Sequence, residues 1–248
     1  ALVMEEHGTN DGPTGWQAHI SGKGNLLMAR IEARQKKRGG QAVDPVLLEI
    51  FNNRFMGLAE EMGAVLEKTS HSVNMKERLD FSCAIFDPDG NLVANAPHMP
   101  VHLGSMGDSV KTVVDQNRGL MKPGDCYMLN DPYNGGTHLP DVTVISPVFL
   151  DDGDTHPSFY VASRGHHADI GGLTPGSMPS SSSNIDEEGV LLNNVKLVDQ
   201  GVFLEAEVRD LLTSATYPAR NPDQNIADLK AQVAANERGI RQMMAMVD

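Results

Sequence analysis

The strongest constraint on the fold of this chain is a stretch that predicts a single β-hairpin between two segments that contain histidine. Residues 142–150 carry β-branched and aromatic side chains, residues 151–154 form a turn, and residues 158–163 return along a second strand. In an antiparallel pair, the first residue of the outgoing strand lies opposite the last residue of the returning strand. We therefore expect Asp141 to lie near His166, give or take one residue of register.

The predicted hairpin brings together donor atoms that are typical of a metal site. His138 lies three residues before Asp141, a spacing that would place the two side chains on opposite faces of a regular strand. The turn-forming loop at residues 130–136 and the proline between the two residues predict a curved approach that can direct both side chains inward. His138, Asp141 and His166 then offer two nitrogens and one oxygen, which suits manganese, iron, zinc or cobalt. The alternative is a set of polar loop residues that hydrogen-bond to the backbone.

Asp80 can supply a second oxygen to such a site. It begins a second predicted hairpin, with strands at residues 80–86 and 92–95, and the same counting rule places it near Pro97 and His98. His98 and His102 can be ligands, substrate contacts or structural residues. From the residues alone the structural interpretation is favoured, because a proline between them opposes a regular helix.

Other polar residues near the second histidine segment also have two interpretations. Arg164 either holds a substrate carboxylate through a two-pronged contact or forms a surface ion pair. His167 is adjacent to His166 in the sequence, so its side chain is expected to point away. Asp169 or Asn130 can orient a ligand imidazole by hydrogen bonding.

The rest of the pattern predicts an α+β fold in which long helices accompany antiparallel hairpins. Asp44 as N-cap and Pro45 in the first position begin a helix that runs to about Thr69. Further helices are predicted over residues 105–117 and after Asn221 and Pro222, with a strand at 127–129 and a loop at 171–189. Residues 1–34 predict short strands and turns, residues 35–41 read as a linker, and a domain boundary is expected near residue 40.

Charge and composition exclude several classes of function. The net charge is −13 without a sustained basic face, which argues against binding to nucleic acid or to an anionic membrane. The sequence contains two separated cysteines, Cys83 and Cys126, and it has neither a secretion signal nor an apolar run long enough to span a bilayer. These features predict a cytoplasmic protein. Phosphate-binding glycine motifs and a Gly-x-Ser-x-Gly elbow are missing, so an enzyme here would use a metal ion. The chain starts without Met and stops within a helical pattern, which predicts a piece of a longer polypeptide.

From Asp44 onward the chain resembles the B-type subunit of the hydantoinase/oxoprolinase family. The resemblance is carried by Asp44-Pro45-Val46, Phe51-Asn52-Asn53 and residues 77–82, 98–106, 130–141 and 166–172. Residues 1–40, with Gly15-Trp16 and Gly24-Asn25-Leu26, resemble the tail of the A-type subunit, as in fused 5-oxoprolinases in which A precedes B. Residues 41–248 would then be the first half of the B-type domain.

The resemblance implies a division of labour. The A-type part binds ATP and magnesium and phosphorylates the carbonyl oxygen of a lactam or hydantoin, and the B-type part receives the activated amide. A divalent metal (zinc, manganese or iron) is then held by Asp80, His138, Asp141 and His166. The family's ketone carboxylases keep a histidine three residues before the aspartate corresponding to Asp169, but they have none at the place of His167 and they lack Asp80.

The implied reaction is the opening of 5-oxoproline to glutamate by water that the metal activates. His138, Asp141 and His166 would be the catalytic residues, and the candidate substrate contacts are His102, Arg164 and His167. We also expect a homo-oligomer. Three alternatives remain: ATP-dependent carboxylation of a ketone, in which the metal stabilises an enolate, a mononuclear iron oxygenase, and a metal-stapled assembly module without chemistry of its own.

Overall fold

The computed structural model describes residues 2–5, 8–11, 16–30, 44–96, 99–151 and 153–247. It divides into two compact units between Asp44 and Pro45, close to the boundary predicted near residue 40. The first unit contains two antiparallel hairpins, β1 (Leu2–Glu5) with β2 (Gly8–Asp11) and β3 (Trp16–Ile20) with β4 (Leu26–Arg30). These strands agree with the short strands expected in this segment. The assignment of residues 1–40 to an A-type part stays a prediction.

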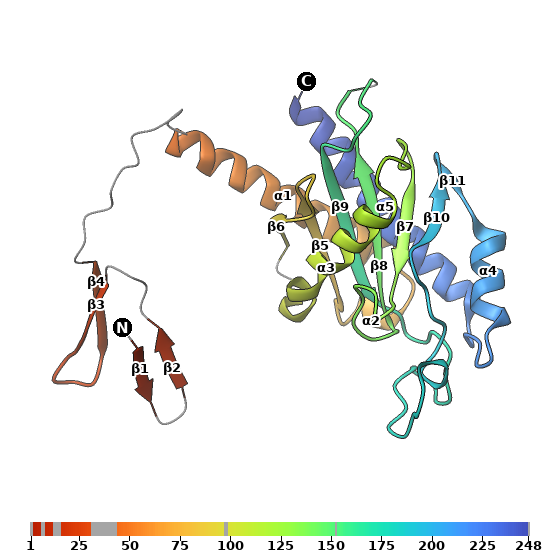
Figure 1. Ribbon diagram of the computed structural model, residues 1–248, viewed down its shortest axis with the longest axis horizontal. Coiled ribbons are helices and arrows are strands. Elements are labelled where there is room, and N and C mark those ends of the chain that lie inside the picture. Colours follow the sequence, from red (N-terminus) through yellow and green to blue (C-terminus); the bar gives the residue numbers. More distant parts are fainter. Residues whose placement is uncertain are drawn as a thin grey trace. The chain divides into compact units, whose positions relative to one another are not determined.

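The second unit is built on an antiparallel sheet of seven described strands, in the order β11-β10-β7-β8-β9-β5-β6 (Figure 1). The strands are β5 (Phe81–Phe86), β6 (Leu92–Asn95), β7 (Cys126–Leu129), β8 (Asp141–Val148), β9 (Phe159–His166), β10 (Val195–Asp199) and β11 (Val202–Phe203). Both predicted hairpins are present, as β5–β6 and β8–β9. The α+β fold class is therefore confirmed.

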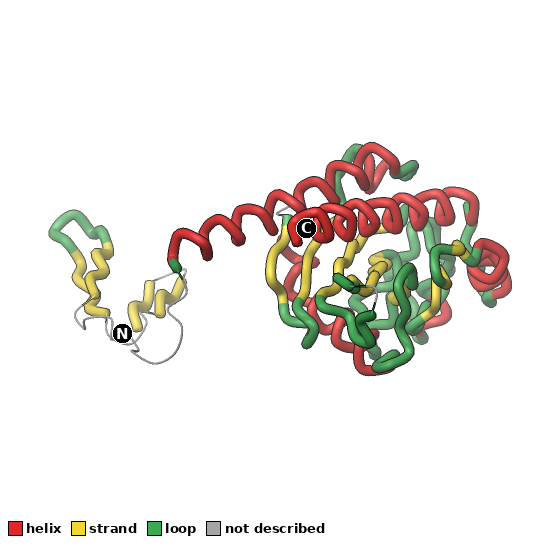
Figure 2. The backbone as a smooth tube through the Cα atoms, turned by 90° about the horizontal axis from the view of Figure 1, so that it is seen from above, coloured by secondary structure: helices red, strands yellow, loops and turns green. Residues whose placement is uncertain are grey.

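Helices cover both faces of this sheet. The long helices α1 (Pro45–Thr69) and α5 (Pro222–Val247) contact each other and pack on one face, where they run side by side (Figure 2). Helix α3 (Pro100–Gln116) packs on the other face, against β5, β8 and β9 (Figure 1). The shorter elements are α2 (Val73–Lys76), α4 (Glu205–Ser214) and the 3₁₀ turn η1 (Ile185–Glu187). Among the described residues, no helix is long and apolar enough to cross a membrane.

Side chains alternate between the two faces along the central strands, so each of them packs against the helices on one face only. Phe81, Cys83 and Ile85 of β5 join the apolar cluster beneath α1 and α5, whereas Ala84 and Phe86 join the cluster beneath α3. Successive residues of a strand point to opposite faces, so every second residue is buried in each cluster. All of β5 and β8 is buried as a result, because both faces of the sheet are covered.

The register of the β8–β9 hairpin is the predicted one. Asp141 is paired directly with His166, and the pairing continues to Val148 opposite Phe159. On its other side β9 pairs with β5, and the backbone N–H of His166 donates to the carbonyl of Asp80 at 3.0 Å. Asp80 thereby lies beside the end of β9, the strand that carries His166. Its predicted proximity to Pro97 and His98 falls outside the described residues.

Helix α3 corrects one sequence-based interpretation. It begins at Pro100, earlier than the predicted start at residue 105, because a proline in the first helical turn has no N–H to lose and its φ already suits a helix. His102 therefore lies in the first turn of this helix, whereas the predicted helix began three residues after it. The predicted starts of α1 at Pro45 and of α5 at Pro222 are confirmed.

The two cysteines, Cys83 and Cys126, are free and buried. Burial raises the pKa of Cys126 to about 12, although a hydrogen bond with Ser146 opposes the shift. Burial also raises the pKa of Cys83 far above its usual value. Both side chains are therefore neutral thiols of the core, consistent with the absence of a nucleophile signature around them.

Candidate metal centre

Three of the four predicted ligands meet at the edge of the α3-covered face. Asp141 Oδ1 lies 2.9 Å from Nδ1 of His166, and Asp141 Oδ2 lies 3.2 Å from Nδ1 of His138. One donor atom from each of the three side chains lies within 4.8 Å of the other two. Among the described residues, this is the one group of three or more histidine, cysteine or acidic side chains that meets this spacing. The convergence predicted from the hairpin is therefore present in the structure.

The backbone explains how His138 and Asp141 face the same way despite their spacing. A turn precedes β8, in which the N–H of Asp141 donates to the carbonyl of His138 at 3.0 Å. Asn130 holds this turn in place, since its amide donates to the carbonyl of Leu139 at 2.8 Å and accepts from the N–H of Leu192 at 2.7 Å. Asn130 thus orients the loop that carries His138, and not the imidazole itself.

The glycine pair of this loop is required by close packing. A Cβ on Gly136 would overlap the backbone of Asn130 and Asp131, and Gly135 has a φ of +86°. Only glycine allows both conditions without strain. The loop glycines therefore shape the approach of the chain to the three candidate ligands His138, Asp141 and His166, which we call the metal group. This agrees with the turn that the sequence predicts.

Asp80 and His102 lie next to the three ligands but outside their group. Nε2 of His102 is 3.4 Å from Asp141 Oδ2 and 3.7 Å from Asp80 Oδ1. The ring of His102 is buried, and its Nδ1 lies 3.2 Å from the hydroxyl of Ser82. That hydroxyl donates to the carbonyl of Met99 at 3.1 Å, so its oxygen accepts from Nδ1–H of His102.

The direction of these hydrogen bonds shows whether the residues around His102 can hold a cation. With its proton on Nδ1, the neutral ring of His102 presents a lone pair on Nε2 toward the two carboxylates. Acceptors that face one another without a proton between them repel, and a divalent cation is the group that relieves such a repulsion. The donor set of two to three imidazoles and one or two carboxylates therefore fits a transition-metal ion.

The ionisation of the group also fits. Burial alone would raise the pKa of Asp141, but hydrogen bonds from His138 and His166 outweigh burial and hold that pKa well below its usual value. The hydrogen bond with Asp141 raises the pKa of His138, against the effect of burial. Burial lowers the pKa of His102, although the charges of Asp141 and Asp80 oppose the shift. At neutral pH the site thus contains an ionised carboxylate and a neutral His102.

Arg164 lies beneath the site as a fully buried side chain. Its Nε donates to Thr143 Oγ1 at 2.7 Å, one terminal nitrogen to Ser105 Oγ at 2.5 Å and the other to Ser109 Oγ at 2.7 Å. Burial lowers the pKa of Arg164 to about 10, so the guanidinium stays charged at neutral pH. The alternative of a surface ion pair is wrong, because the side chain is buried and bonded to hydroxyls.

His167 lies on the opposite face of the sheet from His166. It is fully buried against α5, with Nε2 3.1 Å from Gln232 Oε1 and Nδ1 3.1 Å from Asn225 Nδ2. The structure therefore does not bring His167 to the metal group, in agreement with the alternation expected for neighbours on a strand. Asp169 binds Arg220 at 2.8 Å and the backbone of the following loop, not a ligand imidazole.

The metal group opens into a pocket of about 300 Å³. Its lining comprises the candidate residues together with apolar and hydroxyl side chains: Asp80, Met99, His102, Thr137, His138, Asp141, Arg164, His166 and Met178. This volume suits a small substrate. Of the three candidate substrate contacts, His102 and Arg164 line the pocket and His167 does not.

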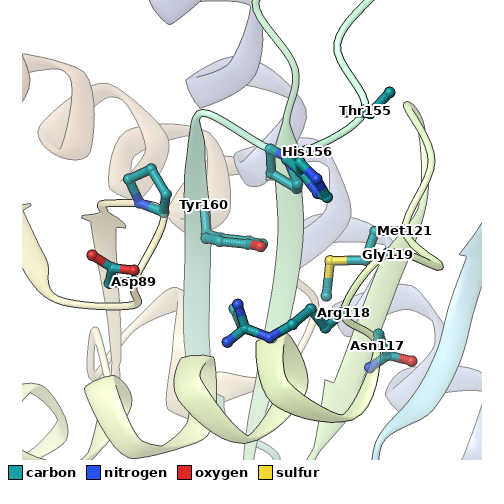
Figure 3. A pocket seen from close by; sticks show the side chains of 11 residues that line it. Asp89, Asn117, Arg118, Gly119, Met121, Thr155, His156 and Tyr160 are labelled. Atoms are coloured by element: carbon teal, nitrogen blue, oxygen red, sulfur yellow. The ribbon is translucent and has the colours of Figure 1, made fainter.

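A separate pocket of about 140 Å³ lies at the other end of the strands (Figure 3). It is formed by the turn before β6, the end of α3 and the turn before β9, and Arg118, His156 and Tyr160 project toward it (Figure 3). None of the candidate ligands lines this pocket. The proposed chemistry therefore belongs to the end of the sheet where β8 begins and β9 ends.

Comparison with known proteins supports the fold and the family resemblance. The family model described as Hydantoinase B/oxoprolinase matches residues 44–248. The 5-oxoprolinase 1 of Arabidopsis thaliana is 46% identical over 257 aligned residues, which cover 100% of this chain and 20% of the plant protein. The chain thus spans about a fifth of the length of that relative.

Two solved structures have a similar fold. A crystal structure of an ATP-dependent caprolactamase from Pseudomonas jessenii has a TM-score of 0.73 at 30% identity, over 84% of this chain and 35% of that one. A nucleotide-free structure of an acetone carboxylase has a TM-score of 0.72 at 18% identity, over 82% of this chain and 26% of that one, and this likeness concerns the fold alone. Because the family model covers the whole of the second unit, this chain belongs to the Hydantoinase B/oxoprolinase family.

Proposed function

We propose that residues 45–248 form the metal-containing part of an ATP-dependent hydrolase of cyclic amides, which opens 5-oxoproline to glutamate or opens a hydantoin. The observation that carries the proposal is the convergence of His138, Asp141 and His166 in a pocket of substrate size. The relatives named 5-oxoprolinase and ATP-dependent caprolactamase support the substrate class. An A-type part of the same protein would bind ATP and magnesium and would phosphorylate the carbonyl oxygen.

His138, Asp141 and His166 would hold the divalent ion (zinc, manganese or iron), with Asp80 at the margin of the group. When bound, such an ion supplies Lewis acidity and lowers the pKa of a bound water toward about 7. The ionised Asp141 would balance its charge and, by contact with both imidazoles, would keep the two rings in place. Arg164 adds positive charge to the wall of the pocket, where it favours an anionic substrate group.

His102 is the candidate for proton transfer. Its ring is neutral because it is buried, and Ser82 holds Nδ1–H, which leaves Nε2 to accept a proton from the attacking water. Its Nε2 lies 3.4 Å from Asp141 Oδ2, and His102 lines the same pocket as the three ligands. This assigns His102 a role in the reaction beyond the substrate contact expected from the sequence.

The proposal is tested with the full-length protein. We expect ATP-dependent release of glutamate from 5-oxoproline, about one divalent ion per chain by elemental analysis, and no turnover of acetone with bicarbonate. Acetone is tested because the fold is similar to that of an acetone carboxylase. Asp80, which lies beside the site, favours ring opening because the family's carboxylases lack it. Carboxylation of acetone without release of glutamate would overturn the assignment. A homo-oligomer and a cytoplasmic location remain proposals.

Removal of the metal should abolish ring opening. After treatment with a chelator and its removal by dialysis, the protein is assayed with ATP and Mg²⁺, so that the ATP-dependent step keeps its own ion. Release of glutamate should fall to background and should return on addition of Mn²⁺, Zn²⁺ or Fe²⁺. Full activity of protein shown by elemental analysis to lack these ions would contradict the proposed centre.

Gly165→Ala should weaken metal binding although it changes no ligand. Gly165 separates Arg164 from His166, and a Cβ there would lie 2.5 Å from Cε and 2.9 Å from Sδ of Met75. Met75 is fully buried, so the end of its side chain cannot swing into solvent, and a shift of β9 that relieves part of the overlap should weaken binding by roughly tenfold, the range seen when a residue outside the ligands is lost. Titration of the metal-free protein measures this effect.

The control for this variant is Gly57→Ala in α1, where an added Cβ meets no atom within 4 Å. It should bind metal as the wild type does. Replacement of Met75 by Ala in the Gly165→Ala background should restore part of the affinity, since it removes the overlap. Wild-type affinity of Gly165→Ala alone would show that the end of β9 tolerates the shift.

A further inference from the structure

Helix α5 presents a row of buried polar side chains to the face of the sheet opposite the metal group. Asn225, Asp228, Gln232 and Asn236 are at most 3% exposed. Their spacing of three to four residues places them along one side of the helix. Buried polar groups destabilise a protein unless they are hydrogen-bonded, so the partners of each one define what it does.

Gln232 connects the two strands that carry the metal group. Its Nε2 donates to the carbonyl of Val142 on β8 at 3.0 Å and to the carbonyl of Ser163 on β9 at 3.1 Å. Its Oε1 lies 3.1 Å from Nε2 of His167. Both amide hydrogens and the amide oxygen are therefore used, and each bond goes to a different point around the end of the hairpin.

The hydrogen-bond network assigns the tautomer of His167. Asn225 Nδ2 can only donate, so Nδ1 of His167 accepts and its proton lies on Nε2. His167 Nε2–H then donates to Oε1 of Gln232, which fixes the direction of the Gln232 amide. With this direction, Nε2 of Gln232 faces the two strand carbonyls.

Two of these contacts involve the residues that directly follow Asp141 and His166 in the chain. Val142 follows Asp141 on β8, and His167 follows His166 at the end of β9. We propose that Gln232 is a positioning residue for the metal centre: by tying Val142, Ser163 and His167 together, it holds Asp141 and His166 at the separation at which both can bind one cation. This inference rests on the proposed metal-dependent function.

Asn236 provides a matched control on the same helix. It is also fully buried, and its Nδ2 donates to the carbonyl of Val144 at 3.1 Å and to Ser146 Oγ at 3.2 Å. These partners lie on β8 alone, further from Asp141, and none of them is next to a ligand on β9. Loss of the Asn236 amide thus removes similar hydrogen bonds to the sheet without loosening the ligand pair.

The test compares Gln232→Met with Asn236→Leu in the full-length protein; each replacement keeps the approximate size and removes the amide. Metal-free proteins are titrated with Zn²⁺ and Co²⁺, and melting temperatures are measured with chelator present. Both variants should melt at lower temperature, because Gln232→Met removes the donor from two buried carbonyls and Asn236→Leu removes it from one carbonyl and one hydroxyl. Only Gln232→Met should bind Zn²⁺ about 10–100-fold more weakly and change the visible spectrum of bound Co²⁺.

Each other outcome has a defined meaning. Wild-type Zn²⁺ affinity in Gln232→Met, or equal weakening in both variants, would overturn the positioning role and leave the proposed function intact. A wild-type protein that binds neither ion would overturn the proposed metal centre and this inference with it. If Gln232→Met does not fold, Gln232→Asn, which keeps the amide on a shorter side chain, is titrated against the same criteria.

Discussion

Asp141→Asn is expected to abolish divalent-metal binding and to reduce ATP-dependent ring opening to background. Asp141 contacts both His138 and His166, so it is the centre of the group. The amide has nearly the same shape but no charge, and its nitrogen would place hydrogens where a cation needs a lone pair. The loss should exceed the roughly 10–100-fold that follows removal of a residue outside the ligands.

The control for this variant is Asp169→Asn, which removes a carboxylate just beyond β9, the strand that carries His166. Asp169 binds Arg220 and the N–H groups of Gly171 and Gly176, not the metal group. It should lower the melting temperature and leave the metal content unchanged, as elemental analysis can show. If Asp141→Asn kept its metal and its activity, the hydrolytic centre would be wrong. Retained activity with loss of oligomer stability would instead favour a metal-stapled assembly module.

Arg164→Met is expected to be the most destabilising single replacement in the second unit. Among the described residues, Arg164 is the largest fully buried side chain, and it donates hydrogen bonds to the hydroxyls of Ser105, Ser109 and Thr143. Loss of a hydrogen bond to a charged group costs about 1.5–3 kcal/mol, so the loss of three such bonds sums to several kcal/mol, although the hydroxyls of Ser105 and Ser109 keep the carbonyls to which they donate. Arg164→Lys should not restore the stability, because an ammonium lacks the planar fork that reaches separate acceptors.

The melting temperature of the full-length protein measures this effect, and Arg118→Met is the control. Arg118 is exposed and pairs with Asp115 at 2.8 Å, and exposed ion pairs contribute little to stability. Its replacement should leave the melting temperature nearly unchanged. Equal melting of Arg164→Met and the wild type would show that the three hydroxyls find other partners and that the buried charge is dispensable to the fold.

The site could be predicted from the sequence where its geometry is local. The β8–β9 hairpin places Asp141 opposite His166 through a short turn and the alternation of the strands, and both can be counted from the residues. The loop before β8 places His138 through glycine and proline chemistry that is equally local. Helices α1 and α5 begin at prolines that the sequence marks.

The start of α3 shows where such counting fails. A proline beside His102 reads as a helix breaker or as a first helical residue, and the choice depends on what the following turns pack against. Met106, Val110 and Val113 pack against β5, β8 and β9, which favours an early start and brings His102 to Asp141. Ser105 and Ser109, four residues apart on this helix, were the available signal for a buried polar partner, and Arg164 is that partner.

The sequence by itself determined the hairpin, its register and hence three donor atoms at one point, because these depend on neighbours along the chain and on a turn of few residues. Only the tertiary structure decided that β5 lies beside β9, that α3 delivers His102 to the pocket and that Gln232 of α5 ties the two ligand strands from behind. The reason is physical: strand order and helix docking are set by burial of both faces of the sheet, a property of the whole fold to which widely separated residues contribute.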